Sequence, residues 1–214
     1  QLTYEAIIRV NNFKTDEFPK KDIATIMGIE QYCLFRIGDA GFPLQQLQFS
    51  SPGENKFPNA DTGKLLQPSE WYHVAVVYDT EKKTAVIYVD GREQSRIEDY
   101  GNGEPVNLGK QTRGSDFMFK IGHSYGEPDY MERQLDGEIC EVRVWNVARS
   151  QQEIFDNMYN IEDPANTPGL QAYWKFNEGE GDIAKDYTRH GNDAKSYAKA
   201  TWPTGIEVTQ KNKE

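Results

Sequence analysis

The stretch at residues 71–91, WYHVAVVYDTEKKTAVIYVDG, constrains the fold more than any other part of the sequence. Two runs rich in valine, tyrosine and isoleucine flank a polar connection, and an Asp-Gly pair follows the second run. This pattern predicts a β-hairpin followed by another tight turn. The first run is apolar at successive positions, so both faces of its strand need cover. We expect a central strand, with one face on the main core and the other under loops, a short helix or an exposed aromatic surface.

Strand-like runs of the same kind recur along the chain. Residues 2–10 alternate, with apolar side chains at every second position. Further candidate strands lie at 23–28, 32–37, 44–49, 92–97, 117–121 and 136–145. Segments rich in glycine, proline, asparagine and aspartate separate them, which is typical of an all-β sandwich. The 214 residues are enough for one sizeable core, so we expect a single domain over 1–214.

One segment has a helical pattern instead. In ARSQQEIFDNMY, Ser150 and Glu153 have the spacing of a capping box, and Ile154, Phe155 and Met158 form one apolar stripe. The sequence therefore predicts one short capping helix near 151–159, covering the end of a sheet.

Composition limits the partners of this chain. Its net charge of −10 repels nucleic acid phosphates and anionic lipid surfaces, so we expect no nucleic acid partner. No run approaches the eighteen or so apolar residues of a membrane helix, so we expect no direct membrane insertion by this domain. Cys33 and Cys140 are expected to be buried free thiols, although spacing alone leaves a disulfide open. His73, His123 and His190 lack the spacing of a zinc site.

The acidic segment EPDYME is the strongest catalytic candidate. Glu127, Asp129 and Glu132 match the ExDxxE spacing that retaining β-glucanases with a jelly-roll fold place along one strand. Pro128 lies inside the motif, however, and proline is excluded from central strands. We therefore predict a loop here and no enzymatic activity. A glycoside hydrolase that uses Glu127 and Glu132 remains an alternative.

A second acidic stretch, NEGEGDIAKDYTRHGND, is rich in glycine. Calcium binds six to eight oxygen atoms, so Asp182 and Asp186 are candidate calcium ligands. The competing interpretation is a solvated turn in which Asp186 accepts hydrogen bonds from backbone amides. We favour the turn, so calcium stays a candidate cofactor and none is assigned.

Aromatic and planar polar side chains occur together in the predicted loops. Flat rings stack on the C–H faces of sugars, and amide, carboxylate or guanidinium groups bind their hydroxyls. The candidate carbohydrate contacts are Arg36, Asp39, Phe42, Tyr100, Asn102, His123, Tyr125 and Tyr130. They predict a binding site on loops at one side of the sandwich. Trp71, Trp145 and Trp174 are instead expected in the core, because they lie inside apolar strand patterns.

Three segments together resemble the concanavalin A-like, laminin G-like jelly-roll domains, above all the group related to pentraxins and bacterial lectin modules. They are WYHVAVVYD with KKTAVIYVDGRE, FKIGHSYG with RQLDGEICEVRVWNVARSQQEI, and GLQAYWKFNEGEG with KDYTRHGND. The resemblance covers nearly the whole chain and implies a concanavalin A-like jelly-roll β-sandwich. It also implies that the hairpin at 71–91 is scaffold and that loops carry the ligand. The pentraxin type of calcium cluster has no match here.

The segment NMYNIEDPANTPGLQAYWKFNEGEG resembles surface proteins of gut anaerobic bacteria. This resemblance implies the C-terminal part of a longer lipoprotein, on the extracellular face of the outer membrane. We therefore expect a non-catalytic module that captures an oligosaccharide or polysaccharide for partner glycan-degrading or transport proteins. A protein-interaction or adhesion module of the laminin G type is the alternative.

Overall fold

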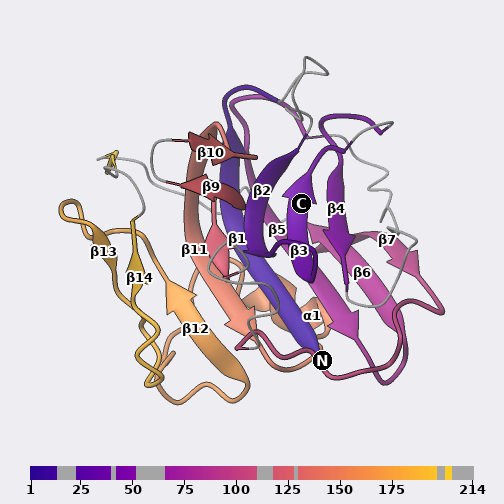
Figure 1. The fold of residues 1–214 in the computed structure, drawn as a ribbon. Coiled ribbons are helices and arrows are strands. Elements are labelled where there is room, and N and C mark those ends of the chain that lie inside the picture. The colour runs from indigo at the N-terminus through magenta and orange to yellow at the C-terminus, as the bar shows by residue number, and fades with distance from the viewer. Residues whose placement is uncertain are drawn as a thin grey trace.

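The computed structural model describes residues 1–13, 23–39, 42–51, 66–109, 118–127, 130–196 and 201–203, with the backbone alone at 125–127 and 130–132. Two antiparallel sheets face each other (Figure 1). The larger sheet has the order β12-β11-β1-β5-β6-β7. Its strands are β1 (Leu2–Val10), β5 (Trp71–Asp79), β6 (Thr84–Val89), β7 (Arg92–Ile97), β11 (Gly137–Trp145) and β12 (Leu170–Trp174).

The smaller sheet has the order β4-β3-β2-β8. Its strands are β2 (Ala24–Ile29), β3 (Cys33–Ile37), β4 (Leu47–Ser50) and β8 (Lys120–Ile121). Two further hairpins are described: β9 (Tyr125–Glu127) with β10 (Tyr130–Glu132), and β13 (Ile183–Ala184) with β14 (Ala194–Lys195). The predicted all-β sandwich with one short helix is confirmed, and the predicted strands at 2–10 and 92–97 have the bounds of β1 and β7.

The main core lies between the two sheets. Alternate residues of β1 and β5 point into it, Tyr4 and Tyr78 among them, and neither has exposed surface. Phe49 of β4 meets both rings, with centroids 6.4 Å from Tyr4 and 5.8 Å from Tyr78. Offset and edge contacts of this kind add to the stability from burial alone.

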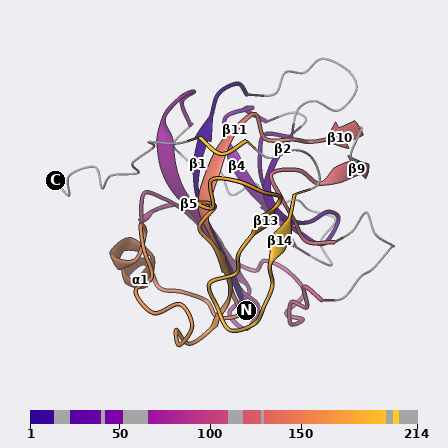
Figure 2. The same ribbon diagram turned by 90° about the vertical axis from the view of Figure 1, so that its left-hand side faces the viewer.

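The outer face of the larger sheet has its own cover, the helix α1 (Gln151–Asp156). Ile154 of α1 packs with Ala75 and Val77 of β5 and with Val86 and Tyr88 of β6. Figure 2 shows the helix on the side of this sheet that faces away from β2 and β4. The second face of the hairpin at 71–91 is therefore covered by the predicted short helix.

The start of α1 is fixed by the predicted capping box. The Ser150 hydroxyl accepts a hydrogen bond from the Glu153 amide, and the Glu153 carboxylate accepts one from the Ser150 amide. The helix ends at Asp156, short of the predicted 159, although Met158 is still buried.

A charged cluster, formed by Glu5, His73, Arg143 and Arg149, lies beneath α1. Glu5 Oε1 is 2.6 Å from Arg149 Nη1, and Glu5 Oε2 is 3.6 Å from Arg143 Nη1. Arg149 also donates to the carbonyl of Glu153 at 2.9 Å, which links the cluster to the helix. Burial alone would raise the pKa of Glu5, but His73 and the two guanidinium groups lower it to about 2.

Several details differ from the sequence-based expectation. The strand predicted at 44–49 begins only at Leu47, and the one predicted at 117–121 comprises Lys120–Ile121 in the described part. Trp71 is half-buried rather than in the core, and the Arg9 guanidinium lies 5.5 Å from its ring centroid.

Cys33 is buried and Cys140 half-buried, and both are free thiols. The helix in the described chain, α1, has six residues, and no described helix is long and apolar enough to span a bilayer.

Candidate functional site

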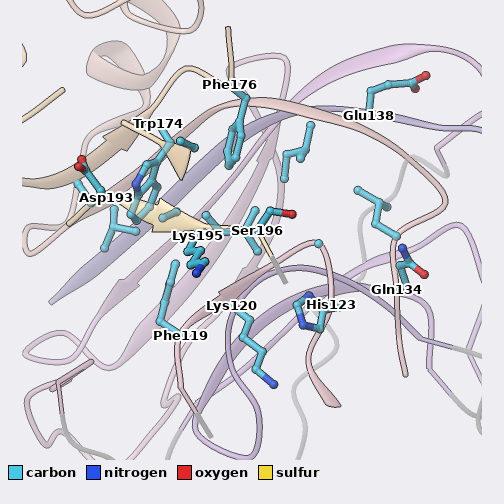
Figure 3. Close-up of a pocket in the computed structure, with 18 of the residues that line it drawn as sticks. Phe119, Lys120, His123, Gln134, Glu138, Trp174, Phe176, Asp193, Lys195 and Ser196 are labelled. Atoms are coloured by element: carbon cyan, nitrogen blue, oxygen red, sulfur yellow. The ribbon is translucent and has the colours of Figure 1, made fainter. Parts of the chain in front are cut away.

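A groove with a volume of about 1440 Å³ opens at one edge of the sandwich. Strand β8 of the smaller sheet lies on one side of it, and β11 and β12 of the larger sheet lie on the other. The β13–β14 hairpin and residues 201–203 complete the lining. Figure 3 shows Trp174 and Phe176 across the groove from Phe119, Lys120 and His123.

Four aromatic residues belong to the apolar part of the lining. Phe119 and Trp174 stack, with ring centroids 6.0 Å apart and ring planes at 25°. Trp174 is only 5% exposed, so it supports the groove from the core side. Phe119, Phe176 and Trp202 are half-buried and line the groove. The groove therefore combines a fixed aromatic base with three partly accessible rings.

Two hydrogen bonds fix the indole rings of the lining. Trp174 Nε1 donates to the carbonyl of Asn192 at 2.7 Å. Trp202 Nε1 donates to the carbonyl of Gly181 at 3.1 Å. Because indole has a single donor, each ring is held in one orientation by its polar edge.

Phe176 has an unusual backbone conformation. Its φ of 56° is in the left-handed region, which is uncommon for residues other than glycine and asparagine. Such a conformation costs about 1–2 kcal/mol and is retained where the surrounding structure requires it. Here it occurs two residues after the end of β12, and the ring of Phe176 projects into the groove (Figure 3).

Polar groups surround these rings. Those lining the groove include Lys120, His123, Gln134, Glu138, Asp182, Asn192, Asp193, Lys195 and Ser196. Glu138 accepts two hydrogen bonds from Arg9, at 2.8 and 2.5 Å. Burial, together with the charge of Lys120, lowers the pKa of His123 below its ordinary value of 6.5. At neutral pH this imidazole is therefore uncharged, with one donor and one acceptor nitrogen.

The loop between β13 and β14 is organised by Asp186. Its Oδ1 accepts from the amides of Tyr173 and Thr188, and its Oδ2 accepts from the Thr188 hydroxyl and the Asn192 amide, all at 2.8–3.1 Å. Burial opposes ionisation of Asp186, but the bonds from Thr188 and Asn192 outweigh it, and the pKa falls below the ordinary value. Asp186 therefore accepts hydrogen bonds from backbone amides, as the turn interpretation of this segment predicted. Asp182, by contrast, is exposed and lines the groove.

In the described part of the chain, no group of three or more histidine, cysteine, aspartate or glutamate side chains is placed so that it could hold a metal ion.

Arg36, Asp39 and Phe42 lie apart from the groove. Arg36 is on β3, 4% exposed, and its guanidinium forms an ion pair with Asp39 and two long hydrogen bonds of 3.4 Å to Gln48 Oε1. The strand register places Arg36 opposite Thr25 on one side and Gln48 on the other. Phe42 is 39% exposed. As carbohydrate contacts these three residues stay a prediction.

Tyr100 and Asn102 have structural contacts. Tyr100 is 2% exposed and its ring packs edge-on against Tyr78, with centroids 5.4 Å apart. This burial argues against direct stacking on a sugar. Asn102 is exposed, and its side-chain oxygen accepts a hydrogen bond from the Glu104 amide, which forms a local turn.

Of the six predicted contacts whose side chains the structure describes, His123 is the one that lines the groove. Tyr125 and Tyr130 belong to the β9–β10 hairpin, where they pair with Glu132 and Glu127, and their side chains lie outside the described part. The aromatic residues of the groove were not predicted as contacts. For Phe176 one signal was present: an aromatic residue placed between a strand and the turn-forming EGEG.

The acidic motif at 127–132 is a hairpin rather than the predicted loop. Glu127 ends β9 and Glu132 ends β10, while Asp129 lies outside the described residues. The single continuous strand that carries the glucanase motif is therefore replaced here by two short antiparallel strands.

A family model and a solved structure both show similarity of this chain to concanavalin A-like and carbohydrate-binding proteins. The model of the concanavalin A-like lectin/glucanases superfamily matches residues 1–155. A "putative carbohydrate binding protein" from Bacteroides ovatus is 35% identical, with a TM-score of 0.67 over 86% of this chain and 48% of that one. This chain therefore spans about half the length of the Bacteroides protein. No curated protein matches the chain.

Two more distant structures share the fold. A heptameric SAP-like pentraxin from Limulus polyphemus is 15% identical, with a TM-score of 0.50 over 72% of this chain and 68% of that one. Domain 4 of an extracellular arabinanase from Geobacillus stearothermophilus, solved with arabinotriose, is 16% identical, with a TM-score of 0.51 over 73% and 65%. With two facing sheets, a short covering helix and a family match over most of its length, the chain belongs to the concanavalin A-like lectin/glucanase superfamily.

Proposed function

We propose that this chain is a non-catalytic carbohydrate-binding module that captures an oligosaccharide in the groove between β8, β12 and the β13–β14 hairpin. One observation carries the proposal: three half-buried aromatic rings, Phe119, Phe176 and Trp202, line the same groove as amide, hydroxyl and charged side chains. Sugars have apolar C–H faces and a polar rim of hydroxyls, so a site for them needs both kinds of group.

The geometry divides these tasks among particular residues. Phe176 and Trp202 are suited to stacking on a sugar ring, since each is half-buried and Trp202 is oriented by its own hydrogen bond. Gln134 and Asn192 are exposed side-chain amides of the lining and are suited to hydroxyl groups. Each stacking contact contributes only about 0.5–1.5 kcal/mol beyond burial, so we expect modest affinity per site.

The relatives support a carbohydrate ligand. The superfamily is named for its lectins and glucanases, and the Bacteroides protein at 35% identity is described as a "putative carbohydrate binding protein". Binding at a bacterial cell surface, for partner glycan-degrading or transport proteins, is part of our proposal.

The charged groups of the groove favour binding over hydrolysis. A glycosidase needs two carboxyl groups placed on either side of the scissile bond, one of them protonated. Glu138 is occupied by the guanidinium of Arg9, and Asp193 accepts the Asp186 amide at 2.8 Å. These two of the four carboxylates in the described lining are committed to structural contacts; of the other two, Asp136 accepts a hydrogen bond from Asn12 and Asp182 is exposed.

A glycan array tests the proposal, run on the purified chain once with calcium and once with EDTA. We expect binding to a defined sugar family that falls by at least about tenfold in Phe176→Ala and Trp202→Ala, because each change removes a stacking platform. Phe155→Ala is the matched control, since Phe155 is a half-buried aromatic residue on α1, away from the groove.

The other outcomes have distinct meanings. Binding lost in Phe42→Ala but kept in Trp202→Ala would move the site to the Arg36, Asp39 and Phe42 region. A blank array under both conditions, with a protein partner recovered by pull-down, would replace carbohydrate capture by a protein-adhesion function.

A further inference from the structure

We propose that the groove selects neutral glycans and discriminates against uronate-containing and sulfated ones; this inference rests on the proposed function. The aromatic rings of the groove can stack on a sugar and its amides can bind hydroxyl groups, but its negative formal charge is unsuited to an anionic ligand. The ligand class is thereby narrowed to polymers of neutral sugars.

The formal charge of the described lining is negative. Asp136, Glu138, Asp182 and Asp193 contribute four carboxylates, whereas Lys120 and Lys195 contribute two ammonium groups. His123 adds no charge at neutral pH, because burial and Lys120 lower its pKa. Even if the Glu138 carboxylate is set aside as neutralised by Arg9, the carboxylates still outnumber the ammonium groups.

The lining also lacks the usual means of recognising an anion. No arginine is among the described residues that line the groove. Carboxylate and sulfate groups are typically bound by an arginine guanidinium, which donates two parallel hydrogen bonds in a bidentate contact. The guanidinium of Arg9, which contacts the lining residue Glu138, already donates two bonds to that carboxylate and lies over the Trp71 ring at 5.5 Å.

Two accessible carboxylates contribute most to this repulsion. Asp182 is exposed, and its backbone carbonyl, not its carboxylate, accepts a hydrogen bond from the Ser196 amide. Asp136 is exposed and accepts a hydrogen bond from Asn12, a neutral partner at 2.8 Å. Neither charge is neutralised by these contacts, and the net charge of −10 on the whole chain acts in the same direction.

The test uses a panel of purified polysaccharides in two classes. Neutral members are mannan, xylan, galactan, arabinan and glucan, and acidic members are polygalacturonate, alginate, chondroitin sulfate and heparin. We expect binding confined to neutral members, with dissociation constants that change by less than about twofold as sodium chloride rises from about 20 to 500 mM, since no ion pair forms.

Charge reversal tests the cause. The double variant Asp136→Lys with Asp182→Lys should increase binding of at least one acidic member by about tenfold or more, and change binding of the neutral ligand by less than about threefold. Asp156→Lys is the control, because Asp156 is an exposed aspartate on α1 that receives a hydrogen bond from Gln152.

The outcomes separate this inference from the proposed function. An acidic polysaccharide bound as tightly as any neutral one by the unaltered chain would overturn the neutral selectivity and leave carbohydrate capture standing. Failure of every member of both classes to bind would overturn both. Acidic binding unchanged by the double reversal would overturn the electrostatic explanation.

Discussion

The Nε2 atom of His73 lies 3.1 Å from Oε2 of Glu5, and neither side chain has any exposed surface. Because the Glu5 carboxylate is ionised, it only accepts, so the imidazole donates from Nε2. With Arg143 and Arg149 this pair joins β1, β5, β11 and the segment that leads into α1. The cluster therefore positions the helix over the outer face of the larger sheet.

Glu5→Gln should destabilise the fold strongly. The change leaves the buried Arg149 without its carboxylate partner, whereas Arg143 keeps the Glu141 carboxylate at 2.6 Å, and breaking a buried ion pair costs about 3–5 kcal/mol. Urea unfolding followed by tryptophan fluorescence measures the free energy of unfolding. Glu93→Gln is the control, since Glu93 pairs with Arg96 on the surface of β7 and should cost less than about 1 kcal/mol. Equal losses in the two variants would contradict the proposed role of the cluster.

Stability should decline in acid because of Glu5. Its pKa is about 2 in the folded chain and about 4.5 ordinarily, so the unfolded chain binds a proton first as the pH falls. The stabilisation is complete above about pH 4.5 and is lost as the pH falls towards about 2, an effect of about 3 kcal/mol at most. Unfolding free energies between about pH 6 and pH 3 test this. Glu5→Gln should show a smaller decline, and an identical decline would assign the effect to other carboxylates.

Phe176→Gly should be less destabilising than Phe176→Ala, although glycine is the smaller residue. Both changes remove the ring, but only glycine adopts the φ of 56° without strain. We expect an advantage of about 1 kcal/mol for glycine in thermal unfolding, and the same loss of glycan binding in both variants. Alanine equal to or better than glycine would show that the backbone at this position relaxes.

Asp186→Ala should loosen the wall of the groove. The carboxylate accepts four hydrogen bonds, three of them from backbone amides, and its loss should cost about 2–4 kcal/mol and weaken glycan binding. Asp182→Ala, an exposed neighbour, should cost less than about 0.5 kcal/mol.

Calcium removal should leave the fold unchanged. Both carboxylate oxygens of Asp186 are occupied by protein donors, so we expect EDTA to alter neither the melting temperature nor binding. A melting temperature that falls by several degrees in EDTA and recovers with calcium would contradict this prediction.

The strands and the helix could be predicted because their signals are local. Residues 2–10 alternate apolar and other side chains along one strand, and Ser150 with Glu153 form a cap within four residues. The double cover of the hairpin at 71–91 was also apparent from sequence, since a strand that is apolar at successive positions must be buried on both faces.

The groove could not be predicted in this way, because it depends on contacts between distant segments. Trp174 was expected in the core, where it is, but its stacking on Phe119 requires β12 and the start of β8 to lie side by side. Tyr100 was predicted as a carbohydrate contact because polar loop residues flank it in the sequence. Its ring instead packs in the core on Phe49 and Tyr78. The left-handed conformation of Phe176 has no sequence signal of its own.

The superfamily match ends at residue 155, and much of the groove is built from residues after that point. Trp174, Phe176, Asp182, Asn192 and Trp202 all belong to this later part of the chain. The groove is therefore built jointly by β8 and β11 of the matched part and by the segment after residue 155. Ala172 and Trp174 of this later segment also belong to the main core, so a change of ligand preference falls on its exposed groove positions, such as Asp182 and Asn192.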